Sequence, residues 1–464
     1  MSRIKKQLEI CPPAYMCKGP NRENFVSTGH KCGYCKGNGW FWGDHCYNVK
    51  SNYTSSAFRS YDVWYANYKW IANVNYIIDA EPEMAGTEAD VAYVAGQAYA
   101  IRALCYLNLA TWFSRAPYNS LTGASRWNEP CVPVYTTGTS IDTGGQPRES
   151  LRTVYGRIDQ DIDRAIELLE KARETTLAEN NKSHINLYVA LGIKSRACLA
   201  EGDWDGAFKA AKRVIDEGGY AVGTKSDLTG GMNSLDKQNV MWGAGIQVAD
   251  QAGGYAGFFT HMDNKEGAYA KSAPKLISKQ LYNRISATDI RRDWWDPSDK
   301  ESPYVSKKFS FANVASFLGD YIYMRVEEMY FTAAEAALRL DDLKSARELM
   351  NTVMAERDPG YSANNRSGTL LGATTTTWTG SFLENILTHR RIELWGEYGR
   401  LFDVRRLGQG IDRRTDDGFS EECISMMNRR NVNITKADTY DWVLTIPKAE
   451  LDANPNINEE DQNP

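Results

Sequence analysis

The sequence predicts an all-α protein, a scaffold of helical hairpins interrupted by long irregular insertions. Three observations support this fold class. From about residue 60 onward, most segments repeat their apolar residues at the spacing of one helix face. Two pairs of such segments align with each other across a short joint. Between the segments lie regions rich in Gly, Pro, Thr and Ser that show no helical period.

The first three predicted helices cover residues 61–80, 87–113 and 149–172. Pro82 follows the first and Pro117 follows the second, and proline just beyond a periodic segment marks the end of a helix. The third has one apolar face that includes Val154 and Ile158. Residues 114–150 are rich in Pro, Gly, Thr and Ser, so we expect a loop there.

Two helical hairpins are predicted further along the chain. The first joins a helix over 185–200 to one that ends near 215, and the second joins 323–340 to a helix that ends near 357. The aligned positions are Ala197, Gly202, Asp203 and Ala207 in the first hairpin and Ala336, Asp341, Asp342 and Ala346 in the second. Small residues between the helices and an Asp that caps the second helix are typical of a tetratricopeptide-like hairpin.

The chain is predicted to have two parts. Residues 1–55 hold five of the nine cysteines and show no helical period, and residues 56–464 form the helical domain. Its insertions cover about 114–150, 221–320 and 359–380. The second insertion is too long for a simple connection, so we expect local structure in it, and binding surfaces are commonly built on such segments.

Charge and composition argue against some classes of function. The net charge of −5 comes from 54 basic and 59 acidic residues that are scattered, and no basic stripe for nucleic acid is present. Trp (13) and Tyr (26) together outnumber Phe (14), and rings with a polar edge suit surfaces that are apolar on one side and wet on the other. No run of about 18 apolar residues exists for a membrane helix. The first residues lack the apolar segment of a secretory signal.

A charged helix is predicted over residues 389–408. Arg390, Glu393 and Glu397 share one face of it, since they are three and four residues apart. Two carboxylates could serve as the acid and base of a glycosidase. Each has an arginine within one turn, however, and a nearby positive charge lowers a carboxyl pKa. We therefore interpret the series as a structural ion-pair helix, a network that locks this helix to the bundle, with Arg390, Arg391, Glu393, Glu397, Arg400, Asp403 and Arg406 as its members.

This segment resembles the C-terminal signature of the SusD/RagB family, which is Glu-Arg-Arg-x-Glu-Leu, then Glu-Gly-x-Arg, then Asp-Leu-x-Arg. The charged residues named above, with Leu394, occupy those places, while His389 replaces the usual first Glu and Gly399 is displaced by one. Other segments resemble the family in the same order, namely 98–117, 155–169, 324–336, 351–357 and the tail 445–464.

The resemblance implies a non-enzymatic binding protein at the cell outer membrane, lipid-anchored, that holds an oligosaccharide or polysaccharide over a TonB-dependent transporter. Binding rings in the family lie between the helices, so no motif identifies them. The candidates here are Trp127, Trp242, Tyr255, Phe258, Trp294 and Trp295. Packing against the scaffold is the alternative for each ring, and we favour it for the last two. Nucleophile-elbow, His-Glu-x-x-His and Walker patterns are absent from the sequence, so no enzyme activity is indicated.

The cysteine-rich start suggests a separate module. Cys32 and Cys35 form a Cys-x-x-Cys-x-Gly-x-Gly knuckle similar to half of a DnaJ-type zinc site, and Cys11 and Cys17 could complete four thiolate ligands. Cys46, His30 and His45 are substitutes, and disulfides or unliganded thiols are alternatives. No cofactor is required otherwise.

A zinc site made of thiolates fits a reducing compartment, whereas the family resemblance implies an exported protein. The two parts of the chain therefore indicate different compartments. A mis-joined gene start or a retargeted variant would explain this. The alternative function is an intracellular, tetratricopeptide-type protein-interaction scaffold with a zinc knuckle.

Overall fold

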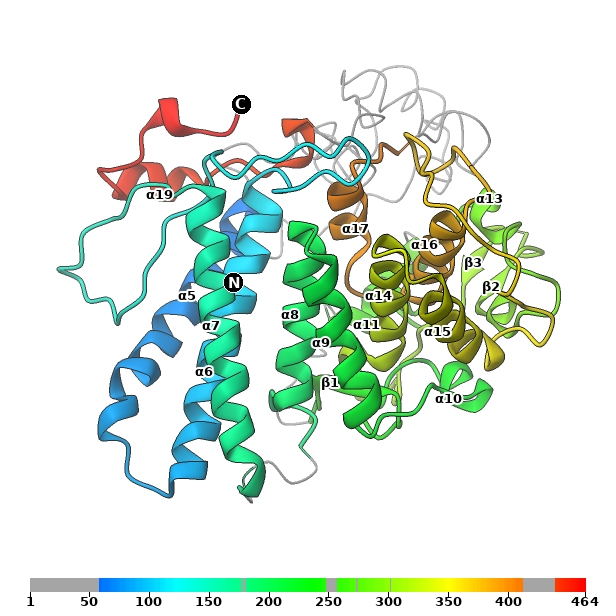
Figure 1. Cartoon of the computed structure of the whole chain (residues 1–464), viewed down its shortest axis with the longest axis horizontal. Helices are drawn as coiled ribbons and strands as arrows, with labels where there is room; N and C mark the ends of the chain where they lie inside the picture. The colour runs from blue at the N-terminus through cyan, green and yellow to red at the C-terminus, as the bar shows by residue number, and fades with distance from the viewer. Residues whose placement is uncertain are drawn as a thin grey trace.

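The computed structural model describes residues 58–175, 177, 181–247, 257–272, 274–300, 302–411 and 439–464 (Figure 1). Across these residues the chain is mainly helical, and its strands form two small two-stranded sheets. The predicted all-α fold class is confirmed. The cysteine-rich segment 1–55 lies outside the described residues.

Long helices form the N-terminal layer, which Figure 1 shows as ribbons lying side by side. They are α5 (Phe58–Ala80), α6 (Glu88–Phe113), α7 (Leu151–Lys171), α8 (Leu187–Glu201) and α9 (Trp204–Glu217), with short 3₁₀ helices η2 (Glu81–Glu83) and η3 (Ala172–Glu174) after α5 and α7. Side chains cap their first turns: Thr87 Oγ1 accepts the Asp90 amide, and Asn186 accepts two amides of α8. The predicted bounds of these helices are confirmed to within a few residues.

The two predicted hairpins are confirmed as α8–α9 and as α14 (Val326–Arg339) with α15 (Leu343–Ala355). Gly202 and Asp341 turn the chain with positive φ values of 78° and 62°. The next residues, Asp203 and Asp342, each accept an amide from the first turn of the second helix. The predicted start of α14 at Tyr323 is wrong, because β4 (Tyr321–Arg325) precedes the helix and pairs with β1 (Val240–Ala244).

The long insertion carries local structure, as expected. Besides β1 it contains α10 (Lys225–Thr229), α11 (Phe258–Met262), α12 (Ala268–Ser272), α13 (Lys279–Tyr282), η5 (Ile290–Trp294), β2 (Trp295–Asp296) and β3 (Val305–Ser306). These short elements enclose a second hydrophobic core that includes Phe259, Ile277 and Leu281. Ile392 of the scaffold also belongs to this core, so the insertion packs directly onto the helical domain.

The single helix predicted over 389–408 is wrong. The structure has α16 (Phe382–Glu393) and α17 (Arg400–Leu407), separated by a turn. Gly396 and Gly399 adopt φ values of 76° and 114° in that turn, a region of backbone conformation that L side chains rarely adopt. Helical spacing therefore ends at Glu393, and Glu397 lies in the turn rather than one helical turn further along the same face.

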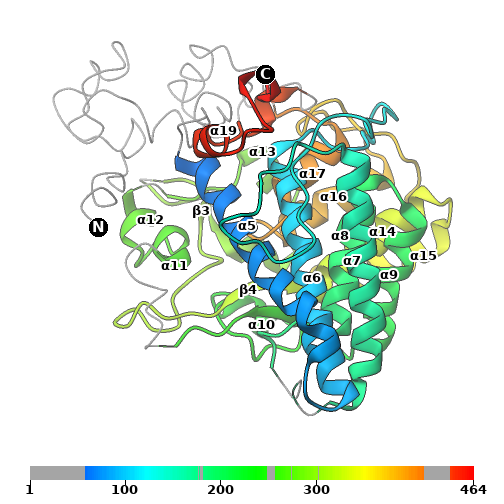
Figure 2. The same ribbon diagram turned by 90° about the vertical axis from the view of Figure 1, so that its left-hand side faces the viewer.

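The C-terminal tail returns to the first helices. It contains η6 (Tyr440–Trp442), α19 (Lys448–Ala453) and η7 (Glu459–Asp461), and Figures 1 and 2 both show α19 close to one end of α5. Asn463 Nδ2 donates to the carbonyls of Phe113 at 2.9 Å and Leu444 at 2.8 Å. Among the described helices, none is both long and apolar enough to cross a bilayer.

Candidate functional site

Trp242 and Tyr323 form an aromatic pair on the β1–β4 sheet. Their ring centroids are 5.0 Å apart in an edge-to-face arrangement, and the Tyr323 side chain is 41% exposed. The Trp242 indole donates to the Ser183 carbonyl at 3.4 Å, which fixes its orientation. On the other side, Met241 and Met324 are buried against the scaffold. The pair therefore presents partly open rings from a rigid sheet.

Two other candidate rings are partly buried by neighbours. Trp127 packs edge-to-face on Tyr155 at 5.7 Å, in the loop between α6 and α7. Phe258 begins α11 and lies 5.3 Å from the ring of Phe309. Tyr255 lies outside the described residues.

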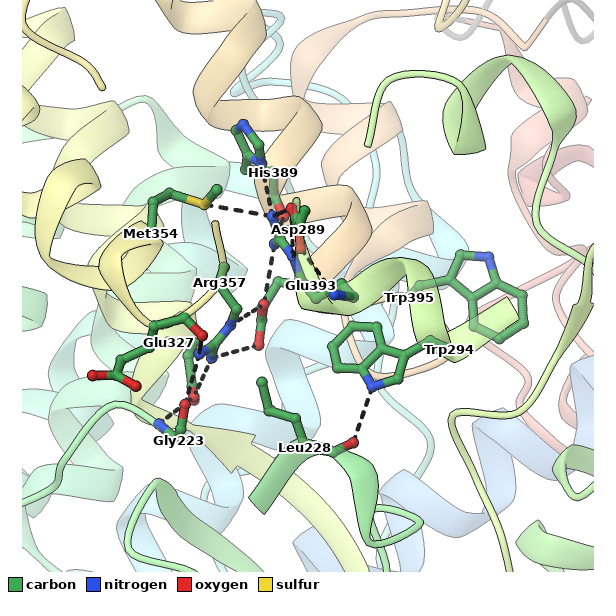
Figure 3. A network of polar contacts seen from close by, with 12 residues as sticks. Gly223, Leu228, Asp289, Trp294, Glu327, Met354, Arg357, His389, Glu393 and Trp395 are labelled. Carbon is green, nitrogen blue, oxygen red and sulfur yellow. Dashed lines mark hydrogen bonds and ion pairs between the residues drawn. The ribbon is translucent and has the colours of Figure 1, made fainter. Parts of the chain in front are cut away.

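Trp294 and Trp295 are core residues. Their exposed fractions are 3% and 1%, and the Trp294 indole donates to the Leu228 carbonyl at 2.9 Å (Figure 3). Trp295 packs edge-to-face against Trp395 at 5.9 Å. Burial leaves these two rings almost no face for a ligand, and their placement matches the scaffold-packing alternative.

Glu393 is the centre of a buried network of charges (Figure 3). It accepts from Arg291 at 3.1 Å, from Arg325 at 3.0 Å and from Arg357 through two nitrogens at 2.9 and 3.0 Å. Arg357 also donates to Glu327 at 2.8 Å. Burial alone would raise the pKa of Glu393, but the guanidinium groups of Arg357 and Arg325 outweigh it and hold that pKa well below its ordinary value.

Glu397 extends the network through Lys308. It receives hydrogen bonds from Arg325 at 2.7 and 2.8 Å and from the Lys308 ammonium at 2.5 Å. Burial lowers the pKa of Lys308 to about 8, with Glu397 acting in the opposite direction. Burial and then the Arg291 guanidinium lower the pKa of His389, so this ring is neutral near pH 7.

A second group of ion pairs joins α14, α16 and α17. Arg390 donates to Asp403 at 2.9 Å, and Arg406 donates to Asp403 at 2.9 Å and to both oxygens of Glu335 at 2.8 Å. Arg391 donates to the Thr375 carbonyl at 3.3 Å, and Arg400 begins α17 and is half-buried. The partners of Glu393 and Glu397 come from distant elements, which matches an ion-pair network that locks this segment to the bundle, whereas Arg406 and Asp403 pair along α17 itself.

The charge network links the insertion to the scaffold. Arg291 belongs to η5 of the insertion, whereas Arg357 follows α15 and Glu393 ends α16. Each of these three side chains is fully buried. Carboxylates held ionised by several arginines and closed to solvent lack both the proton and the access that a general acid needs. These buried ion pairs hold the insertion on the scaffold, and we call them the brace.

A cleft that the sequence did not indicate lies between α5, the loop 133–147 and α19. It has a volume of about 460 Å³. Its aromatic lining consists of Trp64, Tyr65, Tyr68 and Tyr135. The pattern Trp64-Tyr65-x-x-Tyr68 was visible on a predicted helix, but the other walls come from parts of the chain far away in the sequence, so nothing local identified a cleft.

The metal prediction concerns Cys11, Cys17, Cys32 and Cys35, which lie outside the described residues. The described cysteines, Cys105, Cys131 and Cys198, are buried free thiols, and burial raises the pKa of Cys105 and Cys131 to about 12. In the part of the chain that the structure describes, no three His, Cys, Asp or Glu side chains gather as they would around a metal ion.

Comparison with known proteins gives two family matches. The family model described as the SusD family matches residues 267–464, and one described as starch-binding associating with outer membrane, a SusD-like family, matches residues 17–199. No curated protein matches the chain.

Several solved structures share the fold. A SusD-like carbohydrate binding protein from Bacteroides vulgatus is 22% identical, with a TM-score of 0.69 over 98% of this chain and 95% of its own. A SusD superfamily protein from Bacteroides thetaiotaomicron is 23% identical, with a TM-score of 0.68 over 86% and 85% of the two chains. Surface glycan-binding protein A from Bacteroides uniformis is 18% identical, with a TM-score of 0.58 over 87% and 84%. These structures share the fold, and the two family matches, which together span most of the chain, show that it belongs to the SusD/RagB family.

Proposed function

We propose that this protein is a non-enzymatic glycan-binding protein of the outer-membrane surface, which holds an oligosaccharide or polysaccharide for a TonB-dependent transporter. The observation that carries the proposal is the half-open Trp242–Tyr323 pair on a sheet fastened to the scaffold. Family membership and the carbohydrate-binding descriptions of similar proteins support it.

The chemistry of the pair suits a sugar. One side of a pyranose ring exposes C–H groups that pack on an aromatic face, while its hydroxyls need polar partners nearby. Lys182 and Asp320 lie beside the sheet, where the ammonium donates to the Leu235 and Lys237 carbonyls and the carboxylate accepts the Ile246 amide, and each retains hydrogen-bonding capacity for a hydroxyl. Binding without catalysis is consistent with the buried, ion-paired state of Glu393 and Glu397.

Affinity gel electrophoresis in a panel of soluble polysaccharides, starch included, tests the proposal. We expect retention in at least one gel, and Trp242→Ala should weaken it by about tenfold or more, as expected for loss of a central aromatic contact. Trp70→Ala is the control, because Trp70 is 53% exposed on α5 and lies outside the pair. Absence of retention in every polysaccharide, with the fold intact, would overturn the proposal.

The transporter partner is tested separately. Purification of the protein from native outer membranes in mild detergent should recover a large β-barrel transporter in a stoichiometric complex. Recovery of the protein alone, at concentrations where glycan binding is measurable, would remove the transporter from the proposal. The comparisons give no support to the alternative of an intracellular scaffold, and we do not retain it.

Zinc in residues 11–46 remains a proposal that rests on the cysteine spacing. Metal analysis of the purified chain should find about one equivalent of zinc, lost in Cys32→Ser. Zinc below a tenth of an equivalent in protein purified under reducing conditions would exclude it.

A further inference from the structure

We propose that the cleft between α5, the loop 133–147 and α19 is a second saccharide site, separate from the Trp242–Tyr323 pair. This inference rests on the proposed glycan-binding function and adds a second place on the molecule where it occurs. Figures 1 and 2 show α19 well apart from the β1–β4 sheet, so one sugar unit cannot contact both. At about 460 Å³ the cleft is in the range of small-ligand pockets.

Aromatic rings form the base of the cleft. Tyr65 is 50% exposed, so much of its ring is open to a ligand. Tyr68 also lines the cleft, and its ring centroid is 4.8 Å from that of Trp64 and 5.9 Å from that of Tyr135. The rings of Trp64, Tyr68 and Tyr135 thus pack on one another, which keeps this part of the cleft rigid when no ligand is bound.

Polar groups surround the rings. The Lys69 ammonium is 5.8 Å from the Tyr65 ring centroid, and Thr139, Ser140 and Thr143 line the loop side. Glu450 lines the α19 side. Alternating donors and acceptors around an open aromatic face match the hydroxyls and C–H face of a sugar. A purely apolar ligand would instead cover the Lys69 ammonium without offering it a hydrogen-bond acceptor.

Hydrogen bonds hold the carboxylate and both walls in place. Glu450 accepts from the Trp64 indole at 3.2 Å and from Asn454 at 2.8 Å, which orients its two oxygens. Asn456 donates to the Gly145 carbonyl at 2.6 Å and so joins the tail to the loop. Tyr68 donates to the Pro133 carbonyl at 2.8 Å and joins the loop to α5. A site whose walls are already fastened loses little entropy on binding.

Close packing between the tail and the loop leaves one wall sensitive to a small change. A Cβ atom added at Gly145 would lie 2.1 Å from Asn454 Oδ1. Gly145→Ala therefore displaces the Asn454 side chain, which donates to the Gln146 carbonyl of the loop and to Glu450, without removing any ring. We expect this variant to weaken binding in the cleft. Such a loss would show that binding depends on the walls of the cleft and not on one tyrosine alone.

Saturation-transfer NMR on the full-length chain tests the assignment, with D-glucose, D-galactose, D-mannose and D-xylose as probes. We expect transfer from the protein to at least one probe. Tyr65→Ala should reduce the affinity by about tenfold, and Gly145→Ala should reduce it as well. Trp70→Ala is the matched control, since Trp70 is on the same helix with a similar exposure of 53% but does not line the cleft.

The outcomes separate this inference from the proposed function. Transfer that is reduced in Tyr65→Ala, unchanged in Trp70→Ala, and lower still when Tyr65→Ala and Trp242→Ala are combined supports a second site. Transfer lost only in Trp242→Ala overturns the second site and leaves the Trp242–Tyr323 site standing. Retention by a polysaccharide without transfer to any monosaccharide has the same meaning. Displacement of the probes by short peptides rather than by oligosaccharides would assign the cleft to a peptide ligand and also overturn it. Thermal unfolding of each variant shows whether a loss of binding reflects loss of the fold.

Discussion

Glu393 carries a negative charge in the interior of the protein, because Arg291, Arg325 and Arg357 surround its carboxylate. Removing one member of such a network leaves the other charges buried without compensation. We expect Glu393→Gln to lower the free energy of unfolding by about 3–5 kcal/mol, measured by urea denaturation.

An exposed pair provides the comparison for Glu393. Lys448 and Asp452 are 2.6 Å apart on the surface of α19, where water already solvates both charges. Asp452→Asn should leave the urea midpoint unchanged within experimental precision. Equal losses for the two variants would mean that burial is not the source of the effect.

His389 gives stability a dependence on pH. Burial and the Arg291 guanidinium lower its pKa, so the folded protein keeps the ring neutral, whereas the unfolded chain takes up a proton below pH about 6.5. The unfolded state then binds more protons, and stability falls as the pH decreases from about 6.5. The lowered pKa values of Glu393 and Glu397 add a similar loss below pH about 4.5.

The measurement is the melting temperature at several pH values between about 7.5 and 5. Wild-type protein should lose stability across this interval, and His389→Gln should show a smaller change because the titrating ring is gone. An unchanged dependence on pH in the variant would contradict this assignment.

At the scale of elements, local patterns predicted most of the helices and little of the site. Local signals predict helices: apolar residues at helical spacing, a proline after the helix (Pro82) and capping residues (Asp203 and Asp342). Such signals depend on a few neighbouring residues, so the sequence predicted α5 to α9 and both hairpins. The turn at Gly396 was missed because the charge spacing continued through it. The partners of Glu393 and the walls of the cleft were not predictable, since they come from segments up to hundreds of residues apart.

Gly396 makes the turn between α16 and α17 possible. Its φ is +76°, and a Cβ atom there would lie 2.6 Å from the Phe309 ring. Gly396→Ala combines backbone strain of about 1–2 kcal/mol with overpacking of about 1–3 kcal/mol, so we expect a loss of about 2–5 kcal/mol in unfolding free energy.

Gly123 isolates the backbone part of that loss. It has a similar φ of +71°, but nothing lies within 4 Å of the added Cβ atom. Gly123→Ala should therefore cost only the strain, about 1–2 kcal/mol in the same urea experiment. If the two variants lose the same stability, the contact with Phe309 does not constrain the turn.

At the scale of the whole molecule, the insertion keeps its position through buried charge as well as through apolar packing. Arg291 donates to Asp289 at 2.7 Å within the insertion and to Glu393 at 3.1 Å on the scaffold. Sheet β1–β4 and the short elements around α11 are thus fixed to the same scaffold as the helical hairpins. A binding surface built on the insertion gains rigidity from contacts that lie far from any ligand.

Arg291→Met should loosen the insertion while the hairpins keep their order. In hydrogen–deuterium exchange, we expect faster exchange for amides in α13 and η5 and unchanged exchange in α8 and α9. Arg196→Met is the matched variant, because Arg196 forms a buried pair with Glu328 inside the scaffold at 2.7 Å. It should speed exchange in α8 and α14 and spare α13. If both variants gave one uniform increase across the chain, the brace would stabilise the fold globally and would not hold the insertion in particular.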